Sequence, residues 1–132
     1  MRPHLAVTAL LAACLVATAA YAQKQRVDVT FEQFGASGVS GSATLSEMPK
    51  GETNIHAALR GLEPGVEYVA LIYTASSTCG DGTEAFTVVQ FEANPAGVAT
   101  WNEKVGKTIP EIESIGIRVL STNALSACAS VL

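Results

Sequence analysis

Two cysteines, Cys79 and Cys128, are the residues of this chain best suited to chemistry. The third cysteine, Cys14, lies in an apolar segment near the N-terminus. In an oxidising compartment, two cysteines of one small domain pair most readily with each other. A redox-active pair is the functional alternative, but these cysteines lack the Cys-x-x-Cys spacing of such pairs. We therefore predict a structural disulfide, which closes a loop of about 50 residues and would stabilise the fold by roughly 4 kcal/mol.

The other residues able to do catalytic chemistry are few. Beyond the N-terminal segment, His56 is the only histidine, and it lies on the outward phase of its strand, which is typical of a solvated surface residue. No serine or cysteine stands near it in a nucleophile-elbow context. The carboxylates Glu111 and Glu113 lie in a proline-bearing loop and are expected to be solvated. The turn around Asp81 lacks the repeated acids of a calcium loop.

These observations predict no catalytic residues, no metal site and no cofactor. The aromatic residues Tyr73 and Trp101 are the side chains best able to anchor a partner. Trp101 shares the phase of Ala99 and Val105 in its strand, so we expect it in the core. Tyr73 stands at the mouth of a strand, where its ring could either cover the core or contact a partner.

The N-terminal residues have the pattern of a signal peptide. A short basic start precedes the apolar run 5–19, which is too short to span a membrane, and Ala20-Tyr21-Ala22 is a cleavage site before Gln23. The alternative is a lipidated Cys14 in the lipobox-like stretch 11–14. We expect ordinary cleavage, because residues 15–22 stay apolar instead of forming a hydrophilic tether. The predicted location is periplasmic or secreted.

Composition narrows the class of partner. The 132 residues carry a net charge of −4, with basic residues scattered singly and few aromatics. No cluster could therefore collect phosphates, so nucleic acid is excluded as a partner. Residues 23–132 form one predicted domain without a transmembrane segment. The expected partner is an unidentified protein or envelope ligand.

Seven short segments have the period-two alternation or the apolar composition of strands. They are separated by turn signals, and no long amphipathic helix is present. The segments are 27–32, 39–45, 55–59, 66–73, 85–92, 98–105 and 115–121. This pattern predicts an all-β protein, an antiparallel immunoglobulin-like β-sandwich of about seven to eight strands. Segment 107–114 contains Pro110 and is expected to be a crossing loop or a single helical turn.

The turn at residues 63–66 is the strongest local signal. Pro64 and Gly65 suit the second and third positions of a type II turn, for which we expect a hairpin corner. Segment 66–73 is apolar on both faces, so it should be a central strand covered on each side, or one covered by long loops. The polar loop 74–84 follows and contains Cys79. Cys128 lies just past the last predicted strand.

The order of these features resembles a known family. The motif Gly61-Leu62-x-Pro64-Gly65, a strand, Cys79, the turn 94–97, the strand 115–119 and Ala127-Cys128-Ala129 follow one another. This order is similar to the sandwich of the copper,zinc superoxide dismutase family and the related chordin-type (CHRD) domains. The resemblance covers roughly residues 27–132 and implies a Greek-key sandwich in which the second cysteine pairs with the first.

The metal ligands that the resemblance would imply are missing from this sequence. The family's His-x-His pair matches Leu71 to Tyr73, or Ala70 to Ile72 in a shifted register, and its late histidine matches Val119 or Leu120. For zinc, the loop 74–84 offers only Asp81, Glu84 and the paired Cys79. The family's arginine that guides superoxide is not carried over to Arg118, because the register does not support it.

The sequence thus predicts a non-enzymatic exported sandwich domain that acts as a binding or structural module of the cell envelope. The alternative is a metalloenzyme of the superoxide dismutase family with noncanonical ligands. A third possibility is a lipid-anchored envelope protein, which the mass of the mature N-terminus would distinguish.

Overall fold

The computed structural model describes residues 25–131, and these residues form an all-β fold of eight antiparallel strands. The first three strands are β1 (Arg26–Gln33), β2 (Ser40–Met48) and β3 (Glu52–Arg60). The central strands are β4 (Glu67–Tyr73), β5 (Ala85–Glu92) and β6 (Ala99–Val105), and the last two are β7 (Ser114–Val119) and β8 (Leu125–Ser130). The single-turn helices are η2 (Pro49–Gly51) and η3 (Ile109–Glu111). The predicted signal peptide, with Cys14, lies outside the described residues.

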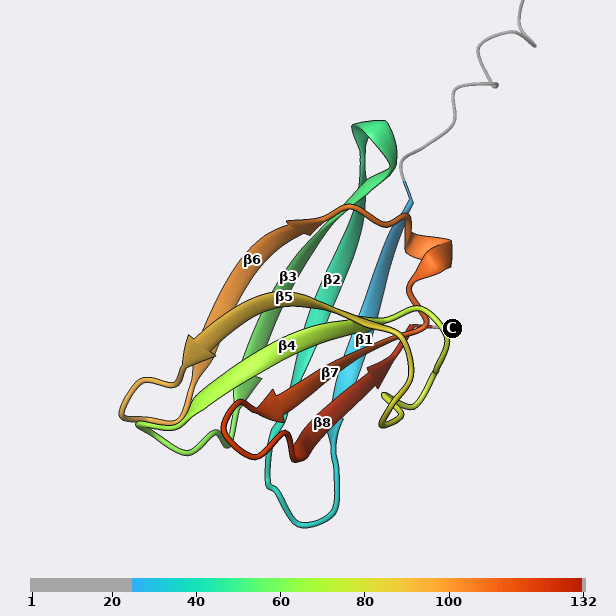
Figure 1. Ribbon diagram of the computed structural model, residues 1–132. Coiled ribbons are helices and arrows are strands. Elements are labelled where there is room, and N and C mark those ends of the chain that lie inside the picture. Colours follow the sequence, from blue (N-terminus) through green and yellow to red (C-terminus); the bar gives the residue numbers. More distant parts are fainter. Residues whose placement is uncertain (1–24, 132) are drawn as a thin grey trace, which may run out of the picture.

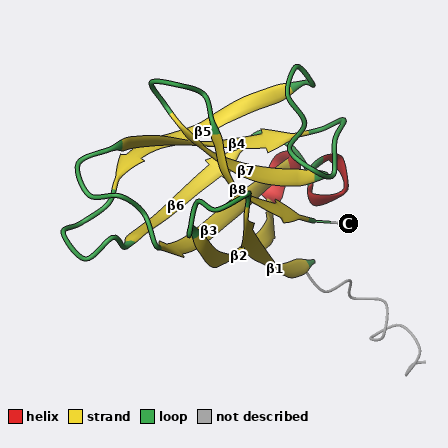
Figure 2. Cartoon of the chain, turned by 90° about the horizontal axis from the view of Figure 1, so that it is seen from below, coloured by secondary structure: helices red, strands yellow, loops and turns green. Residues whose placement is uncertain are grey.

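The strands form one sheet in the order β5-β4-β7-β8-β1-β2-β3-β6, which folds into a nearly closed barrel. One layer contains β1, β2, β3 and β6, and the other contains β4, β5, β7 and β8 (Figure 1). Viewed from below, the two layers face each other, and loops gather at the ends of the strands (Figure 2). Within the described residues, no helix is long and apolar enough to cross a membrane.

Period-two alternation accounts for the core. Val29 and Phe31 of β1 are buried while their neighbours Asp28 and Thr30 are exposed, as predicted. The inward positions of β2 and β3 follow the same rule. Their outer positions are half-buried or exposed, and His56 is one of the exposed residues. The largest fully buried apolar side chains are Phe31, Val39, Leu45, Ile55, Leu59, Ile72, Ile112, Ile115 and Ile117. Removing this apolar surface from water supplies the main driving force for folding.

The turn at residues 63–66 forms as predicted, but the hairpin corner expected there is wrong. Gly65 has φ +83°, and the Val66 N–H donates to the Glu63 carbonyl at 3.3 Å. The turn nevertheless joins two strands from different layers, because β3 pairs with β2 and β6 whereas β4 pairs with β5 and β7. Both neighbours of β3 are already occupied, so the chain crosses the barrel at this point.

A second correction concerns the C-terminal segment. Cys128 does not follow the last strand; it lies within an eighth strand, β8, which pairs with β7 and β1. The strand before it, β7, ends at Val119, two residues earlier than predicted. Ala and Ser have weak strand propensity, so the sequence 125–130 gives little local signal. Its pairing partners on both sides decide its conformation.

Candidate functional site

The loop 74–84 lies over the outer face of β4, β7 and β8 and is held there by several hydrogen bonds and a disulfide. The Cys79 N–H donates to Ser114 Oγ at 3.1 Å, and that hydroxyl in turn donates to the Ser76 carbonyl at 2.5 Å. At the base of the loop, the Thr74 hydroxyl donates to the Glu84 carboxylate at 2.5 Å. The loop therefore covers one side of β4, whose other side faces the core.

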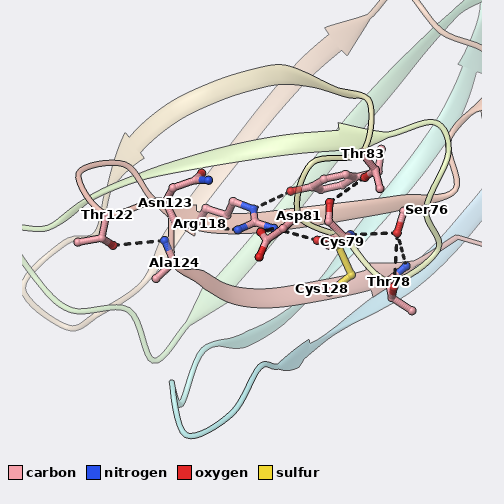
Figure 3. Close-up of polar contacts among 12 residues, drawn as sticks. Ser76, Thr78, Cys79, Asp81, Thr83, Arg118, Thr122, Asn123, Ala124 and Cys128 are labelled. Carbon is pink, nitrogen blue, oxygen red and sulfur yellow. Dashed lines mark hydrogen bonds and ion pairs between the residues drawn. A yellow bond between two sulfur atoms is a disulfide. The ribbon is translucent and has the colours of Figure 1, made fainter.

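The predicted disulfide joins this loop to β8. Cys79 and Cys128 are bonded, with their Cα atoms 6.1 Å apart, which is within the usual range for disulfides. Cys79 is only 1% exposed. Since the loop follows β4 and the second cysteine sits in the middle of β8, the bond ties the loop across the intervening strand β7 (Figure 3).

Arg118 of β7 is the central polar residue beneath this loop. It is 4% exposed, and its guanidinium donates from Nε to the Tyr73 hydroxyl at 2.7 Å. Nη1 donates to the Asn123 carbonyl at 2.7 Å and Nη2 to the Cys79 carbonyl at 2.9 Å. Nη2 also forms an ion pair with the carboxylate of Asp81, at 2.6 Å. Figure 3 shows Arg118 extending toward Asp81 and Cys79 along the outer face of the sheet.

This arrangement fixes a positive charge on the outer face. Burial alone would lower the pKa of Arg118, but its interactions with Tyr73 and Asp81 outweigh burial and raise that pKa above its ordinary value. The carboxylate of Asp81 is largely exposed, with 84% of its side-chain surface accessible. The guanidinium is therefore held by the protein on three sides and is compensated by a surface carboxylate on the fourth.

A glycine makes room for these groups. Gly116 lies beside Cys128 and opposite Leu71 in the sheet register. A Cβ at this position would lie 2.8 Å from Cε2 of Tyr73 and 3.2 Å from Sγ of Cys79. Only glycine therefore allows the tyrosine ring and the disulfide to lie this close to the backbone of β7.

The sequence positions that the family resemblance singled out lie around this site but do not form a metal centre. Leu71 and Tyr73 face the loop, Ala70 and Ile72 face the core, Val119 ends β7, and Leu120 follows it. Within residues 25–131, no group of three or more His, Cys, Asp or Glu side chains is placed to hold a metal ion.

The structure keeps His56 apart from this site. His56 lies on β3 in the opposite layer, between Thr44 of β2 and Asn102 of β6 in the register, and it is exposed as predicted. No imidazole of the described chain therefore reaches the loop 74–84.

The two aromatic residues considered as anchors are both buried. Trp101 is 8% exposed and packs in the core beside Phe91, as predicted. Tyr73 is 2% exposed, so its ring covers the outer face of the sheet instead of projecting as a contact point.

Of the two carboxylates Glu111 and Glu113, Glu111 caps η3 by accepting hydrogen bonds from the Thr108 N–H and hydroxyl at 2.8 and 2.9 Å.

Two contributors to the site, Asn123 and Ser114, carried no functional signal in the sequence. Asn123 has φ +61° in the turn between β7 and β8, a conformation that asparagine tolerates. Ser114 begins β7, and its hydroxyl accepts from the Cys79 N–H and donates to the Ser76 carbonyl. A polar residue at the start of an apolar strand was the only hint of this role.

No protein-family model matches the chain, and no curated protein matches it significantly.

Proposed function

We propose that this protein is an exported, non-enzymatic β-sandwich domain that acts as a binding or structural module of the cell envelope. The observation that carries the proposal is the fixed guanidinium of Arg118 on the outer face of β4 and β7. Arg118 engages the Tyr73 hydroxyl, the Cys79 carbonyl and the Asp81 carboxylate, so these oxygen atoms are already occupied and would have to leave the guanidinium to bind a metal. Of the positions that match the family's histidines, Leu71 and Val119 offer no nitrogen, oxygen or sulfur donor, and the Tyr73 hydroxyl accepts a hydrogen bond from Arg118.

The resemblance to the superoxide dismutase and CHRD sandwiches belongs to the same proposal. Three features support it: the Greek-key strand order, the crossing turn after Gly61-Leu62-x-Pro64-Gly65, and the bond between Cys79 and Cys128. In this proposal the chain keeps the sandwich and its disulfide, while the ligand positions hold Leu71, Tyr73 and Val119.

Metal binding tests the non-enzymatic assignment. The purified protein is expected to bind copper and zinc no better than a domain with one surface histidine, because affinity requires several preplaced ligands. The variant His56→Ala is the control that removes any adventitious binding. Elemental analysis showing stoichiometric, tightly held copper, or superoxide dismutation abolished by chelation, would establish the metalloenzyme alternative instead.

Processing tests the export assignment. Mass spectrometry of the protein recovered from an exporting host is expected to give Gln23, in its free or its cyclised pyroglutamate form, as the first residue. A chain that begins at a diacylated Cys14 would instead make the protein a membrane-anchored lipoprotein, and an uncleaved chain in the cytoplasm would overturn export.

A further inference from the structure

The open side of the barrel lies between β5 and β6, which are the two ends of the strand order. The two strands leave the turn at residues 94–97 and diverge (Figure 1). Close to the turn they still meet, because the Asn94 N–H donates to the Val98 carbonyl at 2.9 Å and the rings of Phe91 and Trp101 lie 6.3 Å apart. Within residues 25–131, no strand pairing joins β5 to β6.

A bulge in β5 accounts for the divergence. Val89 lies opposite Ala70 of β4, whereas Thr87 lies opposite Leu71, so Val88 is an extra residue in β5. An extra residue bends its strand and increases the local twist. The part of β5 before the bulge therefore turns away from β6.

This divergence leaves one aromatic residue of the inner face partly uncovered. Phe86 lies opposite Ile72 in the register, and residues directly opposite each other in antiparallel strands share a face of the sheet. Ile72 is 1% exposed, whereas Phe86 is 39% exposed. The side chain of Lys107 partly covers Phe86, with Nζ 4.6 Å from the centre of the ring. This distance is typical of a cation–π contact.

A groove of about 300 Å³ lies at this place, and we call it the β5–β6 groove. Its apolar surface comes from Ile72, Phe86 and Val105, and its charged residues are Lys104 and Lys107. Among the residues that the structure describes, no acidic side chain lines it. The groove thus combines an apolar floor with a cationic rim.

The fold holds this rim in place. The buried Thr53 hydroxyl donates to the Lys107 carbonyl at 2.6 Å, which anchors the backbone at the end of β6. Neither Lys104 nor Lys107 forms an ion pair with a residue of the described part of the chain. Hydrogen bonds from Thr108 and, to a smaller extent, the charge of Lys107 lower the pKa of Glu111. That carboxylate is bonded to Thr108 and does not line the groove.

The chemistry of the groove selects its ligand. Two ammonium groups without paired carboxylates favour an anion, and the floor favours a hydrocarbon group. The chain as a whole carries a net charge of −4, so a ligand with many negative charges would be repelled by the rest of the surface. Binding pockets for small molecules have volumes of about 300 to 1,000 Å³. The β5–β6 groove lies at the lower end of this range and fits a small ligand.

We propose that the β5–β6 groove binds a small amphiphilic anion, a single apolar chain with one carboxylate head group. This inference rests on the proposed function as a binding module and names the site and the class of ligand. The carboxylate lies between the ammonium groups of Lys104 and Lys107. The chain packs on Phe86, Ile72 and Val105, where it covers the part of the inner face that β6 leaves open.

The test is an NMR titration of the isotope-labelled protein, recovered after expression of the full chain. The probe is octanoate, added below the concentration at which it forms micelles. We expect saturable binding that shifts the amides of Thr87 and Gly106, with nuclear Overhauser contacts between the octanoate chain and the Phe86 ring. Absence of binding, or saturable binding at another surface, overturns the proposal.

Related probes separate the contribution of the chain from that of the charge. From hexanoate to octanoate to decanoate, affinity should rise by about twofold to fourfold for each added CH₂ until the groove is filled. Octanol and octyltrimethylammonium keep the chain but lack the negative charge, and both should bind more weakly than octanoate. Equal affinity for octyltrimethylammonium would show adsorption to an apolar surface alone and overturns the proposal.

A double variant tests the cationic rim. Lys104→Gln with Lys107→Gln is expected to weaken octanoate binding by about threefold to thirtyfold. Arg26→Gln with Arg60→Gln removes the same charge from exposed positions that do not line the groove, and it should leave affinity unchanged. Equal affinities in the two double variants overturn the proposal.

A second pair of variants tests the apolar floor. Phe86→Ala is expected to weaken octanoate binding, because the chain loses its main apolar contact. Val98→Ala is the matched control, since Val98 is 38% exposed and does not line the groove. Thermal unfolding checks that both variants are folded. A folded Phe86→Ala protein with the affinity of the control overturns the proposal.

Three outcomes distinguish other occupants and the proposed function itself. If the amides of Thr87 and Gly106 shift when only the protein concentration rises, the occupant is a second copy of the chain and the ligand assignment is wrong. Binding to phosphatidylglycerol vesicles that octanoate displaces would make the groove a membrane contact and also overturns it. Tight copper binding would overturn the proposed function, whereas failure of the octanoate test without metal binding overturns only the groove assignment.

Discussion

Arg118 Nε and the hydroxyl of Tyr73 lie 2.7 Å apart, although the two residues are 45 positions apart in the chain. Their strands, β7 and β4, are neighbours in the sheet, and both side chains project from the outer face beneath the loop 74–84. The bond fixes the guanidinium against the tyrosine ring, and the loop supplies the remaining partners from Cys79 and Asp81. One buried cation thus joins two strands and the loop that covers them.

Tyr73→Phe tests this bond. The hydroxyl accepts from a charged donor, so its removal is expected to lower the free energy of unfolding by about 1.5 to 3 kcal/mol. The matched control is Tyr68→Phe, whose hydroxyl accepts from the neutral Glu63 N–H at 2.9 Å and should cost about 1 kcal/mol. Urea denaturation measures both changes. Equal losses in the two variants would contradict the special role of the charged pair.

Arg118→Met tests the whole network. Methionine keeps the volume of the apolar arginine stem but leaves the Tyr73 hydroxyl and the carbonyls of Cys79 and Asn123 without their donor. We therefore expect the free energy of unfolding to fall by roughly 2 to 4 kcal/mol. In this background, Tyr73→Phe should cost much less than in the wild-type protein, because the partner is already gone. A double-mutant cycle measures the coupling, and additive losses would show that the two side chains are energetically independent.

Cys128→Ser tests the covalent tie between loop and sheet. The bond closes 49 positions of chain, so its loss should destabilise the fold by about 2 to 5 kcal/mol and lower the melting temperature. Nonreducing peptide mapping is expected to show the Cys79–Cys128 crosslink directly. Free reaction of both thiols with a maleimide in the folded protein would contradict it.

Gly116→Ala tests the close packing beneath the loop. The added Cβ meets the Tyr73 ring and the Cys79 sulfur, so we expect a loss of about 1 to 3 kcal/mol from overpacking. Gly106→Ala is the control, because a Cβ there meets nothing within 4 Å. Thermal unfolding compares the two variants. A Gly116→Ala protein as stable as the control would show that the Tyr73 ring and the disulfide can move to accommodate the added Cβ.

Glu111 provides a test of pH dependence. Hydrogen bonds from the Thr108 backbone N–H and hydroxyl lower the pKa of Glu111 below its ordinary value of 4.5. A carboxylate with a lowered pKa stabilises the fold above the pKa of the unfolded chain, and this contribution is lost as pH falls through the folded pKa. Glu111→Gln should therefore be less stable than wild type at pH 7, and the difference should vanish in acid. NMR titration of the carboxylate checks the midpoint, which Thr108→Ala should move back toward 4.5.

The sequence alone determined the elements whose signals are local. Alternation of apolar and polar residues gave the positions of β1, β2 and β3, and the pair Pro64-Gly65 gave the turn after them, because side-chain period and backbone preference act within a few residues. The pairing of Cys79 with Cys128 also followed from the sequence, since no other cysteine remained in the predicted mature domain. Burial of Trp101 and exposure of His56 followed from their phases in the strands.

Only the tertiary structure decided which elements meet. The turn at residues 63–66 crosses between layers instead of closing a hairpin, because β3 already has a partner on each side. The weak strand formers of β8 become a strand because β7 and β1 provide hydrogen bonds on both sides. Arg118, Tyr73 and Asp81 come together for the same reason: sheet register and the disulfide place distant residues on one face, and neither register nor loop position is encoded in any short stretch of sequence.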